Sequence, residues 1–301
     1  MTENSIVAGA VSAAPAHRVS SYLYKNAKVR LRLLLGAPVF WLGLVYIAAL
    51  LMLLVTAFWS VDEFTGATKV IWNFDNIISL FTNSLYATVT ARTIGIALAV
   101  TVVDVLLALP IAFFMSKVAG PKLRNVLAIS VLLPLWASYL VKAYAWRSVL
   151  SNTGVLQWLL DPLGLHSPGY SLFGAALTLG YMWLPYVILP IYAGLEKIPG
   201  NLLEASSDLG AGTLTTIRRV VFPLVLPSII AGSIFAFSLS LGDYITINIV
   251  GGASQMLGNL IYTNVGTANN LPMAAALALI PIAIMFVYLG TVRRTGALDN
   301  L

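Results

Sequence analysis

The stretch EASSDLGAGT, residues 204–213, is polar and contains two glycines in a chain that is 59% hydrophobic. Asn201 precedes it and is placed to cap a helix, with Glu204 three residues later in the position of a capping box. Gly210 suits the left-handed end of that helix, and Thr213 suits the cap of a second one. We therefore expect a helix–glycine–helix elbow. The alternative is a well-capped connecting loop without a partner.

The composition of the whole chain indicates several membrane spans. Its 301 residues have a mean hydropathy of +0.90, and only 9% of them are charged, which is too little polar surface for a water-soluble globule of this size. The net charge is +6, but the basic residues flank apolar runs, which is typical of membrane topology rather than of nucleic-acid binding. Without cysteine, and with His17 and His166 far apart, the chain offers no obvious metal site.

Apolar runs that can each hold the roughly 20 residues of a membrane helix predict six spans, the second of them interrupted by Arg92 and Asp104. They are Leu33–Val61, Ser84–Ser116, Asn125–Val141 together with the following KAYAW, Ser171–Leu195, Val220–Gly242 and Pro272–Thr291. We predict an all-α transmembrane domain over residues 33–292, with the elbow in the connection 196–222 between the fourth and fifth spans.

Lysine and arginine in the connections predict the orientation. They gather before the first span and after the second, fourth and sixth, at Arg18, Lys25, Lys28, Arg30, Arg32, Lys117, Lys122, Arg124, Lys197, Arg218, Arg219, Arg293 and Arg294. The other side has Lys69 in its loops, with Lys142 and Arg147 near the end of the third span. By the positive-inside rule, the N-terminal tail 1–32, the elbow and the C-terminal tail 293–301 are expected to be cytoplasmic.

The elbow sequence resembles the EAA loop of permease subunits of ABC importers. EASSDLGAG, followed by VFPLVLPSIIAG (residues 221–232), carries the pattern, with Ser206 in place of its second alanine. The resemblance implies a six-helix type I importer permease fold, whose EAA loop is a coupling helix that docks on a separate ATPase. The residues it assigns to this coupling are Glu204, Ala205, Asp208, Gly210 and Ala211.

Three further stretches resemble the spermidine/putrescine-type branch of that family. They are LLPLWASYLVKAYAWRSVLSNTG (residues 132–154), SLGDYITINIVGG (240–252) and MLGNLIYTNVGTANNLPMAAALAL (256–279). The resemblance implies a polyamine such as spermidine or putrescine as the solute. Another small organic solute stays open, because Lys142 stands where the branch would have arginine.

The family resemblance also implies the partners and the location. The expected assembly contains a second permease, identical or homologous, two ABC ATPase subunits and an extracytoplasmic solute-binding protein, all at the lipid of a bacterial inner (plasma) membrane. The chain has no G-x-x-x-x-G-K-[ST] phosphate loop, so we expect no enzyme activity and no cofactor in this subunit. ATP and Mg²⁺ would be bound by the partner ATPase.

Polar and aromatic residues in the apolar spans are candidates for the substrate path: Asp243, Tyr244, Asp104, Trp136, Tyr139 and Trp146. Asp104 lies deep in the second span, where it either bonds to a neighbouring helix or lines the path. Asp243 ends the fifth span and either meets the solute or bonds to loop amides near Gly251 and Gly252. The aromatic residues of the third span are either interface anchors or cation–π contacts.

Two other classes of protein share some of these features. An intramembrane aspartyl protease also has two membrane aspartates, but Val103-Asp104 and Leu241-Gly242-Asp243 do not match the Tyr-Asp and Gly-x-Gly-Asp motifs of such enzymes. An ion-coupled secondary transporter shares the composition, but the chain shows no repeated halves with matching broken helices. The importer permease is therefore the preferred interpretation.

Overall fold

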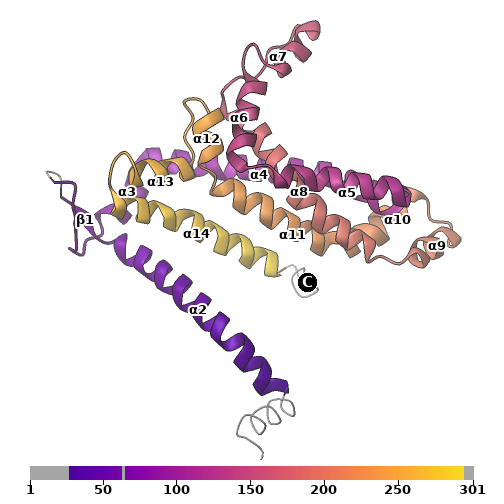
Figure 1. The fold of residues 1–301 in the computed structure, drawn as a ribbon, viewed down its shortest axis with the longest axis horizontal. Coiled ribbons are helices and arrows are strands. Elements are labelled where there is room, and N and C mark those ends of the chain that lie inside the picture. Colours follow the sequence, from indigo (N-terminus) through magenta and orange to yellow (C-terminus); the bar gives the residue numbers. More distant parts are fainter. Residues whose placement is uncertain (1–26, 63–64, 295–301) are drawn as a thin grey trace, which may run out of the picture. The chain divides into compact units, whose positions relative to one another are not determined.

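The computed structural model describes residues 27–62 and 65–294 (Figure 1). Five of its helices are long and apolar enough to cross a membrane, and a sixth span is reached if one bent helix pair counts as a single crossing. This agrees with the predicted all-α transmembrane fold. The chain divides into two compact units, residues 1–55 and 56–301. The predicted N-terminal tail lies largely outside the described residues.

The described part of the first unit is helix α2 (Ala27–Thr56), whose last residue already belongs to the second unit. Its apolar window starts at Leu34, close to the predicted Leu33, and none of that window is buried. The run Leu33–Val61 does hold a span, but it extends beyond the helix, because α2 ends at Thr56 and Ser60–Val61 forms a strand.

The second unit contains the other elements. Its short elements include β1 (Ser60–Val61), β2 (Thr68–Lys69), α3 (Asp75–Thr82), α12 (Ile245–Val250) and α13 (Leu257–Val265). The long helices are α4 (Ser84–Phe113), which continues as the π-helical turn η1 (Phe114–Val118), α8 (Leu172–Glu196), α11 (Phe222–Leu241) and α14 (Leu271–Arg294). The antiparallel pair β1–β2 places Ser60 opposite Lys69.

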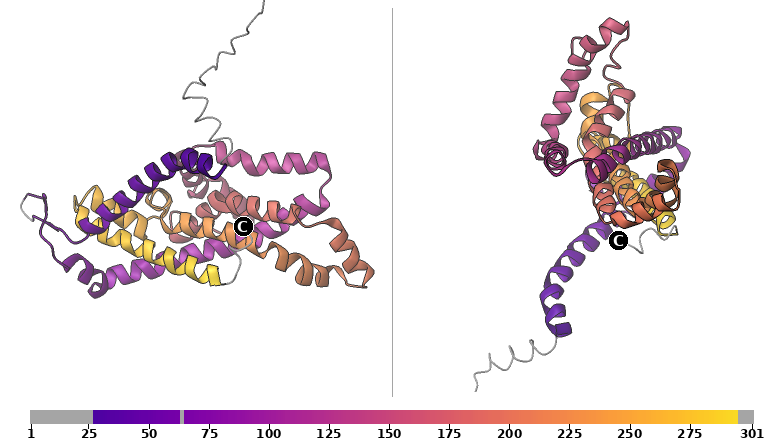
Figure 2. Two further views of the ribbon diagram at one scale, coloured as in Figure 1. Left: turned by 90° about the horizontal axis from the view of Figure 1, so that it is seen from below. Right: turned by 90° about the vertical axis from the view of Figure 1, so that its right-hand side faces the viewer.

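Helices α4, α8 and α11 form the core of this unit (Figures 1 and 2). The Asn83 side chain caps α4 by accepting a hydrogen bond from Leu85 N, and the Ser171 side chain caps α8 by accepting one from Gly174 N. A Cβ atom on Gly232 would lie 3.1 Å from Val187, so this glycine allows α11 to pack closely on α8. Small residues at helix contacts are typical of membrane proteins, in which close packing drives helix association.

The predicted third span is bent rather than straight. Helix α5 (Pro121–Trp136) ends at Ala137, and α6 (Tyr139–Leu150) continues at an angle of 98° to it. The break falls where Ala137 and Ser138 take extended ψ angles of 139° and 140°, whereas Pro134 lies inside α5 without ending it. Helix α6, followed by α7 (Val155–Leu160) and the 3₁₀ turn η2 (Asp161–Leu163), projects away from the long helices (Figures 1 and 2).

The elbow follows α8 as predicted, but the residues that cap its first helix differ from the prediction. Helix α9 (Gly200–Asp208) is capped by Pro199 without a side-chain bond, so the expected capping box of Asn201 and Glu204 does not form. Gly210 has φ +78°, which confirms its left-handed conformation.

The second half of the elbow runs without a break into α11, which corresponds to the fifth predicted span. Helix α10 (Thr213–Thr216) has Gly212 rather than Thr213 as its cap. It continues through the π-helical turn η3 (Ile217–Val221) into α11. Pro223 does not interrupt this continuous helix, in which the π-helical turn η3 lies directly before the proline and alters the local hydrogen-bond pattern.

Candidate functional site

Five of the six residues predicted for the substrate path line one of two separate cavities, and the sixth lines neither. Asp243, Tyr244 and Tyr139 line a pocket where α11 ends and α6 begins. Asp104 and Trp146 line a separate groove between α4 and α8. Trp136, at the end of α5, is 92% exposed and belongs to neither.

The Asp243 carboxylate is buried, with 7% of the residue exposed, and it is fully engaged by two neighbours. Its Oδ1 accepts a hydrogen bond from Thr246 N at 2.8 Å, and its Oδ2 accepts one from Thr246 Oγ1 at 3.1 Å. The Tyr139 hydroxyl donates to Oδ2 and lies 2.7 Å from Thr246 Oγ1. This arrangement fixes a carboxylate at the start of α12. The sequence left open a hydrogen bond from backbone amides near Gly251 and Gly252 to this carboxylate. In the structure the backbone amide that donates to Asp243 is that of Thr246.

Aromatic rings surround this carboxylate on both sides. The Tyr139 ring stacks on Trp183 of α8 at 5.8 Å between centroids, and Tyr244 stacks on Tyr262 of α13 at 4.8 Å. The pocket beside them has a volume of about 230 Å³ and also contacts Leu239 of α11. The role of Trp183 was not predicted from the sequence, because its partner Tyr139 is distant in the chain. A buried carboxylate walled by rings can bind an organic cation.

Close backbone contacts hold Asp243 in place. A Cβ atom on Gly258 would lie 2.5 Å from the carbonyl oxygen of Asp243, so the first turn of α13 reaches this backbone only with glycine there. On the other side, Arg147 of α6 donates to the carbonyl oxygen of Ile249 at 3.0 Å, which ties α6 to α12. The contact between Tyr139 and Thr246 joins the same two helices, so Arg147 supports the position of Tyr139.

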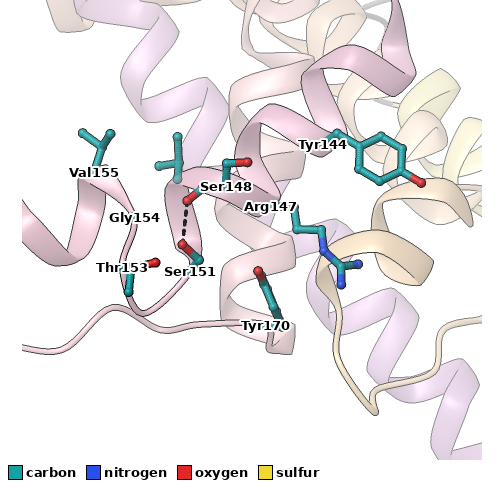
Figure 3. Close-up of a pocket in the computed structure, with 9 residues that line it drawn as sticks. Tyr144, Arg147, Ser148, Ser151, Thr153, Gly154, Val155 and Tyr170 are labelled. Carbon is teal, nitrogen blue, oxygen red and sulfur yellow. Dashed lines mark hydrogen bonds between the residues drawn. The ribbon is translucent and has the colours of Figure 1, made fainter.

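Arg147 also lines an open hollow of about 550 Å³ on the projecting α6–α7 segment (Figure 3). Its guanidinium lies 4.9 Å from the centroid of the Tyr170 ring, a cation–π contact. The neighbouring turn is closed by Ser151 Oγ, which donates to the carbonyl oxygen of Ser148 at 2.9 Å. With its hydrogen bond and its ring contact, Arg147 fastens α6 to the body of the unit.

Asp104 occupies an unusual place in the groove between α4 and α8. The residue is 0% exposed, and neither carboxylate oxygen has a hydrogen-bond partner among the described residues. A Cβ atom on Gly180 of α8 would lie 3.2 Å from Asp104 Oδ1, so glycine makes room for the carboxylate. The groove measures about 670 Å³ and is otherwise apolar, with Trp146 and Tyr181 at 5.4 Å between ring centroids. The predicted bond to a neighbouring span does not form within the described part of the chain.

The predicted coupling residues lie on the surface of the elbow. Glu204, Ala205, Asp208 and Gly210 are exposed and Ala211 is half-buried. Two large apolar side chains beside them are strongly exposed, Leu209 at 88% and Leu214 at 79%. A small elbow that presents apolar side chains and carboxylates together is typical of a protein-docking surface.

A polar cluster fastens the base of the elbow to α4 and α5. Lys117 Nζ donates to the carbonyl oxygen of Ile198 at 2.8 Å, directly before α9. Arg124 of α5 pairs with Glu196 at 3.4 Å, and Tyr192 donates to the same carboxylate at 2.5 Å. In the sequence, Lys117 and Arg124 indicated only the orientation of the chain in the membrane. The cluster that they form with Ile198 and Glu196 was not predicted.

The chain belongs to the family described as binding-protein-dependent transport system inner membrane component, whose model matches residues 97–294. It is therefore a multi-pass membrane protein and a permease subunit of an ABC importer, a class of subunit that is not an enzyme. The protease and secondary-transporter alternatives are thereby removed.

Two similar relatives come from Escherichia coli (strain K12). The inner membrane ABC transporter permease protein YdcU is 42% identical over 94% of this chain and 95% of its own. The spermidine/putrescine transport system permease protein PotB is 31% identical over 86% of this chain and 95% of its own.

Solved structures share the fold at low sequence identity. A chain of a bacterial ABC transporter involved in the import of the acidic polysaccharide alginate has a TM-score of 0.66 and 18% identity, covering 92% of this chain and 99% of its own. A chain of the MetNI methionine ABC transporter has a TM-score of 0.56 and 16% identity, covering 69% of this chain and 93% of its own. The type I importer permease fold predicted from the sequence is thus confirmed.

Proposed function

We propose that this permease forms half of the translocation path for a small organic cation, a polyamine such as spermidine or putrescine. The observation that carries the proposal is the Asp243 pocket, in which a fixed, buried carboxylate lies between Tyr139, Tyr244 and Trp183. A cation that leaves water needs compensating charge or aromatic faces, and this pocket provides both.

The relatives support the same class of solute. Permeases named for spermidine/putrescine transport from Escherichia coli and Haemophilus influenzae are 31% and 34% identical to this chain. Their names state what those systems carry, and the Asp243 pocket gives a chemical reason for extending the solute class to this chain.

We further propose that the elbow docks on an ABC ATPase that binds ATP and Mg²⁺, two such subunits serving the pair of permeases. Glu204, Asp208 and the exposed Leu209 would form the contact, with Gly210 setting the angle between α9 and α10. An extracytoplasmic binding protein would deliver the solute at the opposite end. The elbow and both tails are then cytoplasmic, in line with the distribution of lysine and arginine.

A second solute class has one observation in its favour. Lys142 is a buried lysine on α6, one turn after Tyr139, with 9% of the residue exposed. A buried ammonium suits a carboxylate, so a zwitterionic or anionic solute is the alternative cargo.

ATP hydrolysis by the assembled complex separates the two solute classes. The complex with its ATPase and loaded binding protein should hydrolyse ATP faster with putrescine or spermidine, and not with a dicarboxylate or a neutral amino acid. Stimulation only by a solute that carries a carboxylate would favour the Lys142 alternative and contradict the proposal.

Thiol labelling tests the proposed orientation, and the chain contains no native cysteine to interfere. Ala268→Cys, at an exposed position near α14, should react with an impermeant reagent from outside intact cells. Gly212→Cys, at the exposed elbow, should react only after the membrane is opened. The reverse pattern would overturn the orientation.

A further inference from the structure

A row of four aromatic rings leads away from the Asp243 pocket along the core helices. Tyr139 stacks on Trp183 at 5.8 Å between centroids, Trp183 lies 5.9 Å from Tyr186, and Tyr186 lies 6.5 Å from Phe235. The rings come from α6, α8 and α11, so the row depends on tertiary packing rather than on the pattern of one helix.

The row reaches from the end of α11 toward the middle of the membrane. Phe235 lies six residues before the end of α11 and Tyr186 ten residues before the end of α8. At 1.5 Å per residue these are roughly 9 Å below the Asp243 end and roughly 15 Å above the elbow end. Against a hydrocarbon core of about 30 Å, the last two rings lie near its centre.

The row lies at the edge of the packed core, to which Trp183 belongs and against which Tyr139 and Tyr186 pack. Trp183 is buried at 7%, but Tyr139 and Tyr186 are half-buried and Phe235 is 49% exposed. Three of the four rings thus present surface outside the chain's own packing, and the buried Trp183 connects Tyr139, beside the carboxylate of the pocket, to the other two.

We propose that the Tyr139–Trp183–Tyr186–Phe235 row is the inward continuation of the solute path, along which an organic ammonium moves from Asp243 by successive cation–π contacts. This inference rests on the proposed function and names the residues that select for cations within it. The face of each ring attracts a cation with modest energy, and the spacing of about 6 Å matches the reach of such contacts.

The chemistry of the row favours passage over retention. A path must bind its solute well enough to admit it and weakly enough, at several sites, to release it. A carboxylate within the row would hold the ammonium, whereas its rings provide shallow sites without a fixed charge. Asp104 is outside the row, in the separate groove between α4 and α8. With the Asp243 carboxylate at its outer end and rings beyond it, the row meets both requirements.

Ring removal in the assembled complex tests the row. Tyr186→Leu and Phe235→Leu should each slow ATP-driven uptake of labelled putrescine into proteoliposomes by about tenfold. The ring-preserving variants Tyr186→Phe and Phe235→Tyr should stay within about twofold of wild type. Phe286→Leu is the matched control, since Phe286 is a 72% exposed ring on α14 that is not in the row.

The outcomes separate this inference from the proposed function. Equal uptake by the leucine and the ring-preserving variants would overturn the row as a path while leaving the cation proposal intact. An equal loss in Phe286→Leu would assign the effect to general packing and also overturn it. Absence of putrescine uptake by the wild-type complex would contradict the proposed function itself, and with it the row.

Discussion

Replacing Asp243 by asparagine keeps the shape of the pocket and removes its charge. Asparagine Oδ1 can still accept the hydrogen bond from Thr246 N, now 2.8 Å long, and its amide group can donate to the hydroxyls of Thr246 and Tyr139. We therefore expect the variant to assemble and to retain basal ATP hydrolysis, and to lose only the attraction for a cation.

The size of that loss follows from the structure. A unit-charge pair at about 4 Å and an effective dielectric constant of about 20 is worth about 4 kcal/mol. The three hydrogen bonds that Asp243 already accepts, and the water that the ammonium gives up, offset part of this energy. A net value of about 2 kcal/mol, typical of a charge-assisted bond, corresponds to roughly 30-fold.

The assay is the initial rate of labelled putrescine uptake into proteoliposomes at saturating, loaded binding protein. Asp243→Asn should lower this rate by about 30-fold at equal protein content. Asp75→Asn removes an exposed carboxylate from α3 and should leave it unchanged. A rate for Asp243→Asn within about twofold of wild type would refute the role of this carboxylate in the path.

Two further predictions concern the elbow. Gly210→Val should uncouple ATP hydrolysis from uptake, because a β-branched residue at φ +78° costs about 1–2 kcal/mol and shifts α9 against α10. Gly212→Val, equally open but at φ −69°, should couple normally, and equal behaviour of the two would argue against the strained turn. Lys117→Met removes the bond to the Ile198 carbonyl oxygen and should raise the ATP consumed per solute severalfold, whereas the exposed Lys122→Met should not. An unchanged ratio in Lys117→Met would show that this bond does not transmit elbow movement.

Features set by local chemistry were predictable from the sequence. Most long helices follow from apolar runs of membrane length, as in the prediction Ser171–Leu195 for α8 (Leu172–Glu196). The left-handed Gly210 follows from the preference of that backbone conformation for glycine. Both features depend on residues within one segment.

Features set by packing between segments were not predictable. The bend between α5 and α6 falls at Ala137 and Ser138, which have no strong preference for a break, while Pro134 stays helical. In the sequence Trp183 is one of many apolar residues of the fourth span. Its stacking on Tyr139 depends on the packing of α6 against α8, which the sequence pattern does not reveal. The deep position of Asp104 in the second span was predicted from the sequence. The apolar groove around it was not, because it is formed by two helices and by the space that Gly180 leaves.

The most direct test of the central claim is ATP-dependent uptake by the wild-type complex of this permease with its second permease, ATPase subunits and binding protein in proteoliposomes. Labelled putrescine or spermidine should accumulate against its gradient only when ATP and Mg²⁺ are supplied on the elbow side, while a labelled dicarboxylate should not. Accumulation of the dicarboxylate without either polyamine, or polyamine uptake that needs no ATP, would contradict the account.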